Sequence, residues 1–158
     1  MAARVDLAGG RVHAVEVAMP AAPHCWYVEL PEPDATPPAA TLVAFSDLRF
    51  PEGTVLDAGQ AEAAGVSAAH QVAAFRWWPG SGLVHQIYVG AEHRRRGLAV
   101  KLGLVTFGMQ VARGLPHLHD DGRRTDLGET WRQALPEFMS ATMAERSEWL
   151  PPMTPAAV

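Results

Sequence analysis

The sequence predicts an α/β fold with a mixed, largely antiparallel sheet flanked by helices. Three observations lead to this prediction. Short apolar runs of strand type recur before residue 50, separated by segments rich in proline and glycine. A strong β-hairpin signal occupies residues 71–89. A long apolar pattern of helical period follows it at residues 94–113.

The 158 residues suit one domain, which we assign to residues 1–150, followed by a flexible tail at 151–158. The formal net charge of −4 gives no general attraction to nucleic acid or anionic membranes, so neither is an expected partner. The single cysteine, Cys25, permits no intrachain disulfide. The sequence contains neither the apolar segment of a signal peptide nor an apolar run long enough to span a bilayer. We therefore expect a cytoplasmic protein.

Strands are predicted throughout the first third of the chain. Apolar residues, alternating or continuous, mark three of them, at residues 11–19, 25–30 and 41–45. Prolines concentrate at residues 31–38, which must form a loop because proline fits neither a helix interior nor a central strand. The alanine-rich residues 58–69 predict a short helix.

A hairpin and a long helix follow. Aromatic and β-branched residues predict strands at 71–78 and 83–89, and the sequence PGSG between them is a strong turn signal. Residues 94–113 predict a helix in which apolar residues recur at steps of three and four along two stripes. A helix that is apolar on two faces is covered on two sides, by a sheet and by a further element or subunit.

The remaining elements are short. Gly114 and Pro116 end the long helix. We expect a short strand at residues 116–119, a helix at 125–135 and another at 137–150, the last one ended by a pair of prolines.

The turn into the long helix holds the residues that suggest chemistry. Arg94, Arg95 and Arg96 stand directly before Gly97 in an otherwise acidic chain. The N-terminus of a helix exposes unpaired N–H groups and a partial positive charge, and therefore binds anions. Because Gly97 has no Cβ, a phosphate can approach the backbone closely there. The sequence thus predicts a pyrophosphate site at the start of this helix.

The string RRRGLA at residues 94–99 resembles the signature Q/R-x-x-G-x-G/A of the GNAT acetyltransferase superfamily. In that family the signature follows a strand and opens the helix that lies under the CoA pyrophosphate. Val89 ends the preceding strand at the matching place, and the hairpin fits the family's two central strands. The resemblance covers residues 71 to about 135, somewhat under half the chain, and makes this an atypical member.

By this resemblance the chain binds acetyl-CoA as co-substrate and transfers its acyl group to an amine of a small molecule or a protein. The alternative is a GNAT-like module that binds CoA or a protein partner without transfer. The cofactor-binding residues that the resemblance implies are Ile87, Tyr88 and Val89 for the pantetheine arm, Arg94, Arg95, Arg96, Gly97, Leu98 and Ala99 for the pyrophosphate, and Lys101 as a further phosphate ligand.

Two departures from the family pattern are visible. The family's two N-terminal helices stand before the central strands, but residues 21–40 are rich in proline, so these helices are reduced or replaced by strands. The family often places a tyrosine after the fifth strand as the acid that protonates the CoA thiolate. Trp131 occupies the matching position here, and an indole N–H is not a usable acid.

His85 is the candidate general base. It lies on the strand that the family uses to present the thioester, and regular alternation puts it on the same face as Ile87 and Val89. Histidine titrates near 6.5, so it accepts a proton at neutral pH. The alternative is that His85 is a packed or hydrogen-bonded side chain.

Other interpretations have less support. His117 and His119 share a strand face near Asp120 and Asp121, but such a pair is common and no cysteine supports it, so no metal is expected. A nucleic-acid-binding module would depend on the arginine cluster alone and conflicts with the net charge. A homodimer is expected from the two apolar faces of the long helix.

Overall fold

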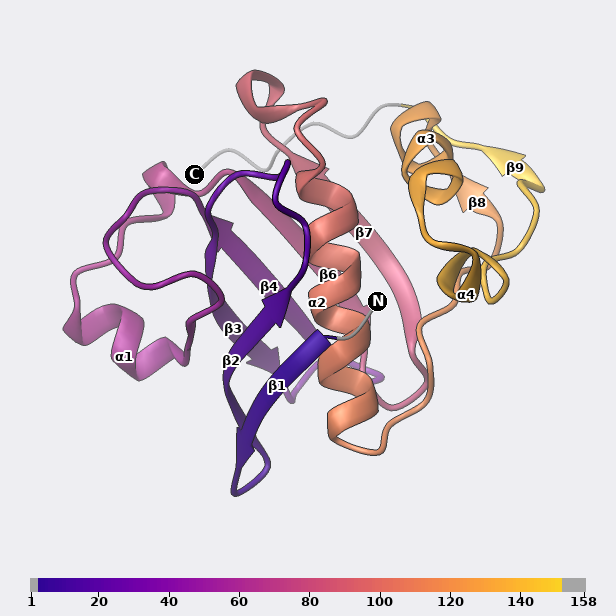
Figure 1. The fold of residues 1–158 in the computed structure, drawn as a ribbon. Helices are drawn as coiled ribbons and strands as arrows, with labels where there is room; N and C mark the ends of the chain where they lie inside the picture. Colours follow the sequence, from indigo (N-terminus) through magenta and orange to yellow (C-terminus); the bar gives the residue numbers. More distant parts are fainter. Residues whose placement is uncertain (1–2, 152–158) are drawn as a thin grey trace.

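The computed structural model describes residues 3–151, which form a mixed α/β fold with a mostly antiparallel sheet (Figure 1). The predicted fold class is confirmed at this level. Of the flexible tail predicted at residues 151–158, all but Pro151 lies outside the described residues.

The central sheet has five strands in the order β5-β3-β4-β6-β7. Neighbouring strands pair in antiparallel fashion, except that β3 and β5 are parallel. Two further strand pairs are the antiparallel hairpin β1–β2 and the parallel pair β8–β9. The bounds are β1 (Ala3–Ala8), β2 (Arg11–Val17), β3 (Trp26–Glu32), β4 (Ala39–Phe45), β5 (Val55–Leu56), β6 (Ala73–Trp78), β7 (Leu83–Val89), β8 (Arg123–Arg124) and β9 (Glu148–Trp149).

Four α-helices within residues 3–151 accompany these strands. Their bounds are α1 (Ala58–Ala63), α2 (Leu98–Ala112), α3 (Asp126–Ala134) and α4 (Glu137–Ser140), and short 3-10 helices occupy Ala68–His70 and Ala91–His93. A capping box at Asp57 and Gln60 starts α1. Thr125 caps α3 by accepting a hydrogen bond from the Gly128 N–H at 3.0 Å.

Helix α2 is the centre of the core. It packs against β4, β6 and β7 of the central sheet and also against the β1–β2 hairpin (Figure 1). The hairpin is joined to the central sheet because the Val15 N–H donates to the Gly53 carbonyl at 2.8 Å, next to β5. The strands therefore curl around α2, and the hairpin is the further element that the two apolar stripes of the helix predicted.

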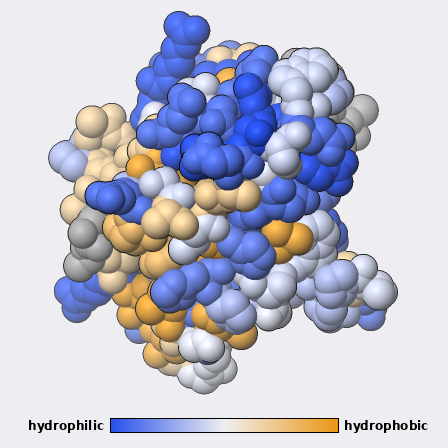
Figure 2. Space-filling view, turned by 90° about the vertical axis from the view of Figure 1, so that its right-hand side faces the viewer, coloured by the Kyte–Doolittle hydropathy of each residue, from blue (hydrophilic) through white to orange (hydrophobic). Residues whose placement is uncertain are grey.

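The opposite face of the sheet is only partly covered. A second core cluster around Trp26, Val28 and Phe45 packs beneath α1 and the loop that holds Phe50. The Trp26 and Phe45 rings stack with their centroids 4.4 Å apart. Figure 2 shows a different side of the molecule, with hydrophilic residues over its upper part and hydrophobic residues gathered at its lower left.

Most of the predicted elements are confirmed. The strands expected at 11–19, 25–30, 41–45, 71–78 and 83–89 correspond to β2, β3, β4, β6 and β7, and the helix expected at 125–135 to α3. The helix expected at 58–69 is confirmed only as α1, and a separate 3-10 helix follows at Ala68–His70 after a turn. The described residues before Ala58 contain no helix, in agreement with their proline content. The strand expected at 116–119 is reduced to one isolated parallel bridge between Leu83 and His119.

The helix expected at 94–113 begins four residues later, at Leu98. Arg95 and Gly97 have φ of 64° and 79°, and these left-handed conformations cannot continue into a right-handed helix. The three arginines therefore form an irregular loop before α2 and are not part of its first turn.

The prediction of a single helix at residues 137–150 was wrong. Only Glu137–Ser140 is helical, and the chain then turns back to form β9 beside β8. Long-range hydrogen bonds hold this segment. The Thr142 hydroxyl donates to the Leu118 carbonyl at 2.6 Å, and the Arg124 guanidinium donates to the Ala144 carbonyl at 2.7 Å. These tertiary contacts outweigh local helix propensity.

No helix among residues 3–151 combines the length and the apolar character needed to cross a membrane.

Candidate functional site

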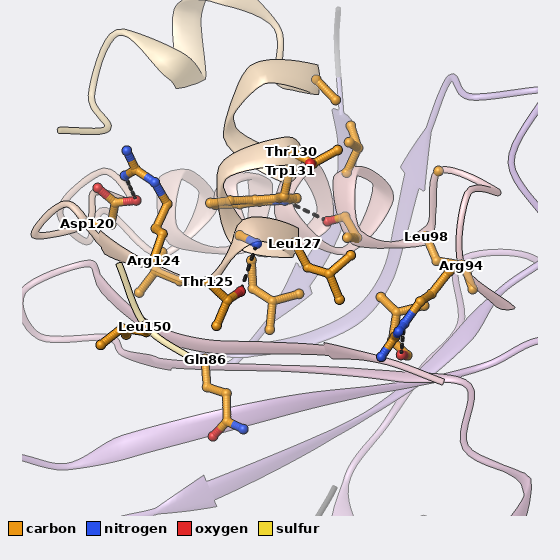
Figure 3. A pocket seen from close by; sticks show the side chains of 18 of the residues that line it. Gln86, Arg94, Leu98, Asp120, Arg124, Thr125, Leu127, Thr130, Trp131 and Leu150 are labelled. Atoms are coloured by element: carbon orange, nitrogen blue, oxygen red, sulfur yellow. Dashed lines mark hydrogen bonds and ion pairs between the residues drawn. The ribbon is translucent and has the colours of Figure 1, made fainter. Parts of the chain in front are cut away.

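A pocket of about 470 Å³ lies between β7, the start of α2, and α3 (Figure 3). Apolar side chains form most of its walls, and arginines stand at two places on its border. Val84, Ile87 and Val89 come from β7, Leu98 and Val100 from α2, and Leu127, Trp131 and Ala134 from α3. Arg94 and Arg95 precede α2, and Arg123 and Arg124 belong to β8.

The pocket is open because the segment that follows α2 pairs with β7 at a single bridge and then leaves the edge of that strand. The Val84 N–H donates to the His119 carbonyl at 2.8 Å, and the His119 N–H donates to the Gly82 carbonyl at 2.9 Å. Gly82, with φ of 79°, permits this approach, because a Cβ there would lie 2.2 Å from the His117 carbonyl oxygen. Beyond this bridge no strand among the described residues pairs with the outer edge of β7.

A β-bulge determines which groups of β7 face the pocket. Arg76 of β6 lies opposite Gln86, but Trp77 lies opposite Val84, so His85 is the extra residue. The Val89 carbonyl points to the outer edge, where it accepts a hydrogen bond from Arg94 Nε at 3.2 Å. Main-chain groups alternate in direction along a strand, so the N–H and carbonyl of Ile87 point to that edge as well. The open edge of β7 therefore presents main-chain donors and acceptors to the pocket.

The start of α2 forms the anionic end of the site. Gly97 is the N-cap and provides no side chain, and the first intrahelical bond runs from the Lys101 N–H to the Gly97 carbonyl at 2.9 Å. The N–H groups of Leu98, Ala99 and Val100 therefore have no partner within the helix. Arg94 and Arg95 are exposed and make no ion pair with residues 3–151. Free N–H groups and free cations together favour a bound anion.

Helix α3 forms the opposite wall through Trp131 (Figure 3). The Trp131 indole is 5% exposed and its N–H donates to the Ala99 carbonyl at 2.9 Å. The N–H is thus committed to a structural hydrogen bond, and Trp131 positions α3 against α2. That Trp131 does not serve as an acid stays a prediction from the chemistry of the indole N–H.

The arginines beside α3 are occupied. Arg124 is buried and forms ion pairs with Asp120 and Glu129, the latter at 2.7 Å. Arg123 pairs with Glu148 at 2.8 Å. Their charges are largely neutralised, which leaves the loop before α2 as the more positive part of the border.

Several residues expected in the site lie elsewhere. Lys101 belongs to α2 and its side chain is buried. Its Nζ donates to the Pro23 carbonyl at 2.7 Å and forms an ion pair with Glu52. It does not line the pocket, so we do not assign it to a phosphate. Arg96 and Tyr88 also do not line the pocket. Tyr88 lies opposite Ala74 on the sheet, one residue out of phase with Ile87 and Val89.

His85 borders the pocket, but the face predicted for its side chain was wrong. The bulge shifts the alternation by one residue, so that His85 and Gln86 both lie on the Arg76 side of the sheet. Figure 3 shows the Gln86 side chain pointing away from the pocket on that side. The His85 ring packs edge-on against Trp78 with centroids 4.9 Å apart, and its Nδ1 lies 3.0 Å from Arg76 Nη1.

This contact works against a role for His85 as a base. A guanidinium only donates, so Nδ1 must accept and the neutral ring carries its proton on Nε2. Both ring nitrogens are then occupied, one by the Arg76 hydrogen bond and one by a proton. Arg76 itself is held by Glu32, whose two carboxylate oxygens lie 3.1 and 2.9 Å from its nitrogens.

His85 is expected to titrate below the ordinary value of 6.5. Burial lowers the pKa of His85 and the Arg76 charge lowers it further, while Glu32 opposes them. Because the folded-state pKa is depressed, this group destabilises the fold as pH falls through 6.5 and below. Replacing Arg76 with methionine should raise the pKa, as measured by an NMR titration of the ring protons. Arg49→Met, which removes a distant cation, should leave the titration unchanged.

Sequence reasoning missed the α3 side of the pocket. Thr125, Leu127 and Leu150 border it, but nothing in their local pattern connects them with residues 94–99. The signal that could have located them is the amphipathic pattern of α3, which requires the face carrying Trp131 to be buried against another element.

The residues considered for a metal are engaged otherwise. The His117 ring packs near Phe107 with centroids 5.2 Å apart, and Asp120 pairs with Arg124. Among residues 3–151 no group of three or more histidine, cysteine or acidic side chains is placed to hold a metal ion.

Comparisons of the chain with protein-family models, with curated proteins and with solved structures find no match. The function must therefore be argued from the pocket itself.

Proposed function

We propose that this protein is an acyl-CoA-dependent N-acyltransferase with an atypical GNAT-like fold, which transfers an acetyl group from acetyl-CoA to an amine of a small molecule or a protein. One observation carries the proposal. The pocket joins the open edge of β7 to a helix start whose first N–H groups have no partner within the helix and whose neighbouring Arg94 and Arg95 form no ion pair among residues 3–151. Such a site suits a ligand with an extended amide-containing arm and a phosphorylated end.

CoA has this construction. Its pyrophosphate would accept hydrogen bonds from the N–H groups at the start of α2, with Arg94 and Arg95 as counter-charges. Its pantetheine arm would extend along β7 and pair with the main chain of Ile87 as an added strand does. The apolar walls from β7 and Trp131 would enclose the methylene groups of the arm.

The reaction follows from the position of the thioester at the end of this arm. The neutral amine attacks the thioester carbonyl, the C–N bond forms and the C–S bond breaks. The nitrogen loses one proton, and the CoA sulfur gains one. An outward N–H of β7 near Val89 would stabilise the oxyanion that develops on the carbonyl oxygen. A lysine-type amine has a pKa near 10.4, so it must be deprotonated before attack.

Binding is tested first. Mass spectrometry of the purified protein should detect bound CoA or acetyl-CoA. Calorimetry should show that CoA binds and that pantetheine, which lacks the pyrophosphate, binds at least roughly tenfold more weakly, because charge-assisted hydrogen bonds are lost. Equal affinities for the two compounds would contradict a phosphate site at the start of α2.

Turnover is tested separately. Release of CoA from acetyl-CoA should depend on an added amine in a panel of small amines and lysine-containing peptides. Binding of CoA without turnover for any amine would favour the alternative, a GNAT-like module that binds CoA or a protein partner. One observation favours that alternative. No tyrosine is among the residues that line the pocket, and the Trp131 N–H is already bonded.

A further inference from the structure

A second feature of the molecule lies away from the pocket, at the N-terminal hairpin. Strand β1 pairs with β2 along one edge, and its other edge pairs with no strand among residues 3–151. Unpaired edges of this kind attract further strands, and proteins usually protect them with charged side chains, proline, bulges or covering loops. β1 has neither a proline nor a bulge of its own, and its two charged residues, Arg4 and Asp6, have opposite signs. The irregularity in its pairing falls on β2, where His13 is the extra residue.

An apolar groove runs beside this open edge. It has a volume of about 370 Å³, and its lining comes from β1, from Val17 at the end of β2, from α2 and from Phe138 of α4. Ala3 and Val5 rest directly on α2, since a Cβ on Gly108 would lie 3.1 Å from the Ala3 Cβ. Val111 and Phe138 are 50% and 45% exposed. The hairpin therefore covers α2 only in part, and an uncovered apolar strip continues past its edge.

The charges on β1 are unused. Arg4 and Asp6 are exposed, and neither forms an ion pair with any residue in the range 3–151. They flank Val5, and side chains alternate along a strand, so both point to the face opposite to Val5. The order is thus a cation, an apolar residue and an anion along one open strand edge.

This order is complementary to itself. If two copies of β1 pair in antiparallel fashion about Val5, Arg4 of each copy lies opposite Asp6 of the other, and Ala3 lies opposite Leu7. A two-fold axis generates both ion pairs from one arrangement, as an isologous interface requires. Parallel pairing in register would instead place like charges side by side.

We propose that the open edge of β1 is a homodimer interface, in which two copies pair antiparallel about Val5 and cover the apolar grooves beside the strands. The occupant of the edge is a second copy of this chain because the charge pattern matches its own reverse. This proposal does not depend on the proposed acyltransferase function. It differs from the dimer expected through the second face of α2, because the hairpin covers part of that face.

Charge exchange tests the interface. Arg4→Asp and Asp6→Arg each place like charges opposite one another in the dimer, so each should weaken the dimer by roughly tenfold or more. The double variant restores both ion pairs with their signs exchanged and should recover the dimer. Both side chains are exposed, so the fold should tolerate the changes, which circular dichroism would verify.

Sedimentation equilibrium of the full chain measures the dissociation constant of each variant. Arg49→Asp is the matched control for Arg4→Asp, since it lowers the net charge by the same amount at an exposed position outside the hairpin and should have no effect. A wild-type protein that is monomeric at 100 μM would overturn the proposal. So would a dimer that both single variants leave unchanged, because its interface would lie elsewhere. Recovery in the double variant, after loss in both single ones, would support it.

Discussion

Replacing Gly97 with glutamate is expected to weaken CoA binding by roughly a hundredfold while the protein remains folded. The new carboxylate would stand at the N-cap of α2, where the proposed pyrophosphate accepts its hydrogen bonds. It would repel the phosphates and would compete for the same N–H groups. A Cβ at this position lies 3.5 Å from Met19 Cε and 3.8 Å from Ala22 Cβ, so the fold has room for a side chain. Calorimetry with CoA measures the effect.

Two controls separate charge from backbone strain. Gly97 has φ of 79°, a conformation that costs a residue with a Cβ about 1 kcal/mol. Gly97→Ala introduces this strain without a charge or a side-chain acceptor, so it should retain most of the affinity. Gly114→Glu introduces the same charge at a glycine with φ of 67° and open space around it, beyond the opposite end of α2. It should bind CoA normally, and a loss of binding in this variant would show that the effect at Gly97 is not local.

The sequence was sufficient to predict the elements that form one side of the pocket. The hairpin of β6 and β7 was predicted because its strand and turn signals agree, and the end of α2 because Gly114 and Pro116 follow it. Gly97 was singled out for its lack of a Cβ, and it adopts a left-handed conformation at the N-cap of α2. Each of these features is determined within a few residues, so local pattern is sufficient.

The position of His85 was not predictable in this way. Its face depends on a bulge opposite Arg76 and Trp77, and a bulge is decided by pairing between two strands. The Trp77 ring enters the core and its N–H donates to the buried Gln110 at 3.1 Å. This contact fixes the phase of β6 at its end, and β7 adjusts by one extra residue. A prediction that assumes strict alternation along β7 misses such a shift, and it assigns every residue on the far side of the bulge to the wrong face of the sheet.

Residues 137–150 and β1 show the same limitation on a larger scale. The helical pattern after Glu137 is overruled by hydrogen bonds from Thr142 and Arg124 to distant carbonyls. β1 was not predicted, and five of its six residues are exposed, so it has little of the hydrophobic alternation that identifies a strand. Both segments owe their conformation to partners far away in the chain.

Replacing Trp131 with alanine is expected to lower the free energy of unfolding by about 3–5 kcal/mol. The ring fills the space between α2 and α3, because a Cβ on Gly103 would lie 3.2 Å from the indole. It also packs edge-on against Phe75 with centroids 6.1 Å apart. Alanine would leave a cavity and would remove the hydrogen bond to the Ala99 carbonyl. Urea denaturation followed by circular dichroism measures the change, with an unchanged slope indicating a comparable unfolding transition.

Trp149→Ala is the matched control, since this side chain is 57% exposed on β9 and its loss should change stability by less than about 0.5 kcal/mol. Trp131→Phe keeps an aromatic ring but no N–H group, and its cost should fall between the two. If Trp131→Ala were as stable as the control, the wall of the pocket would not be a packed part of the core. The position of α3 would then require a different explanation, because the indole N–H provides a hydrogen bond from α3 to the start of α2.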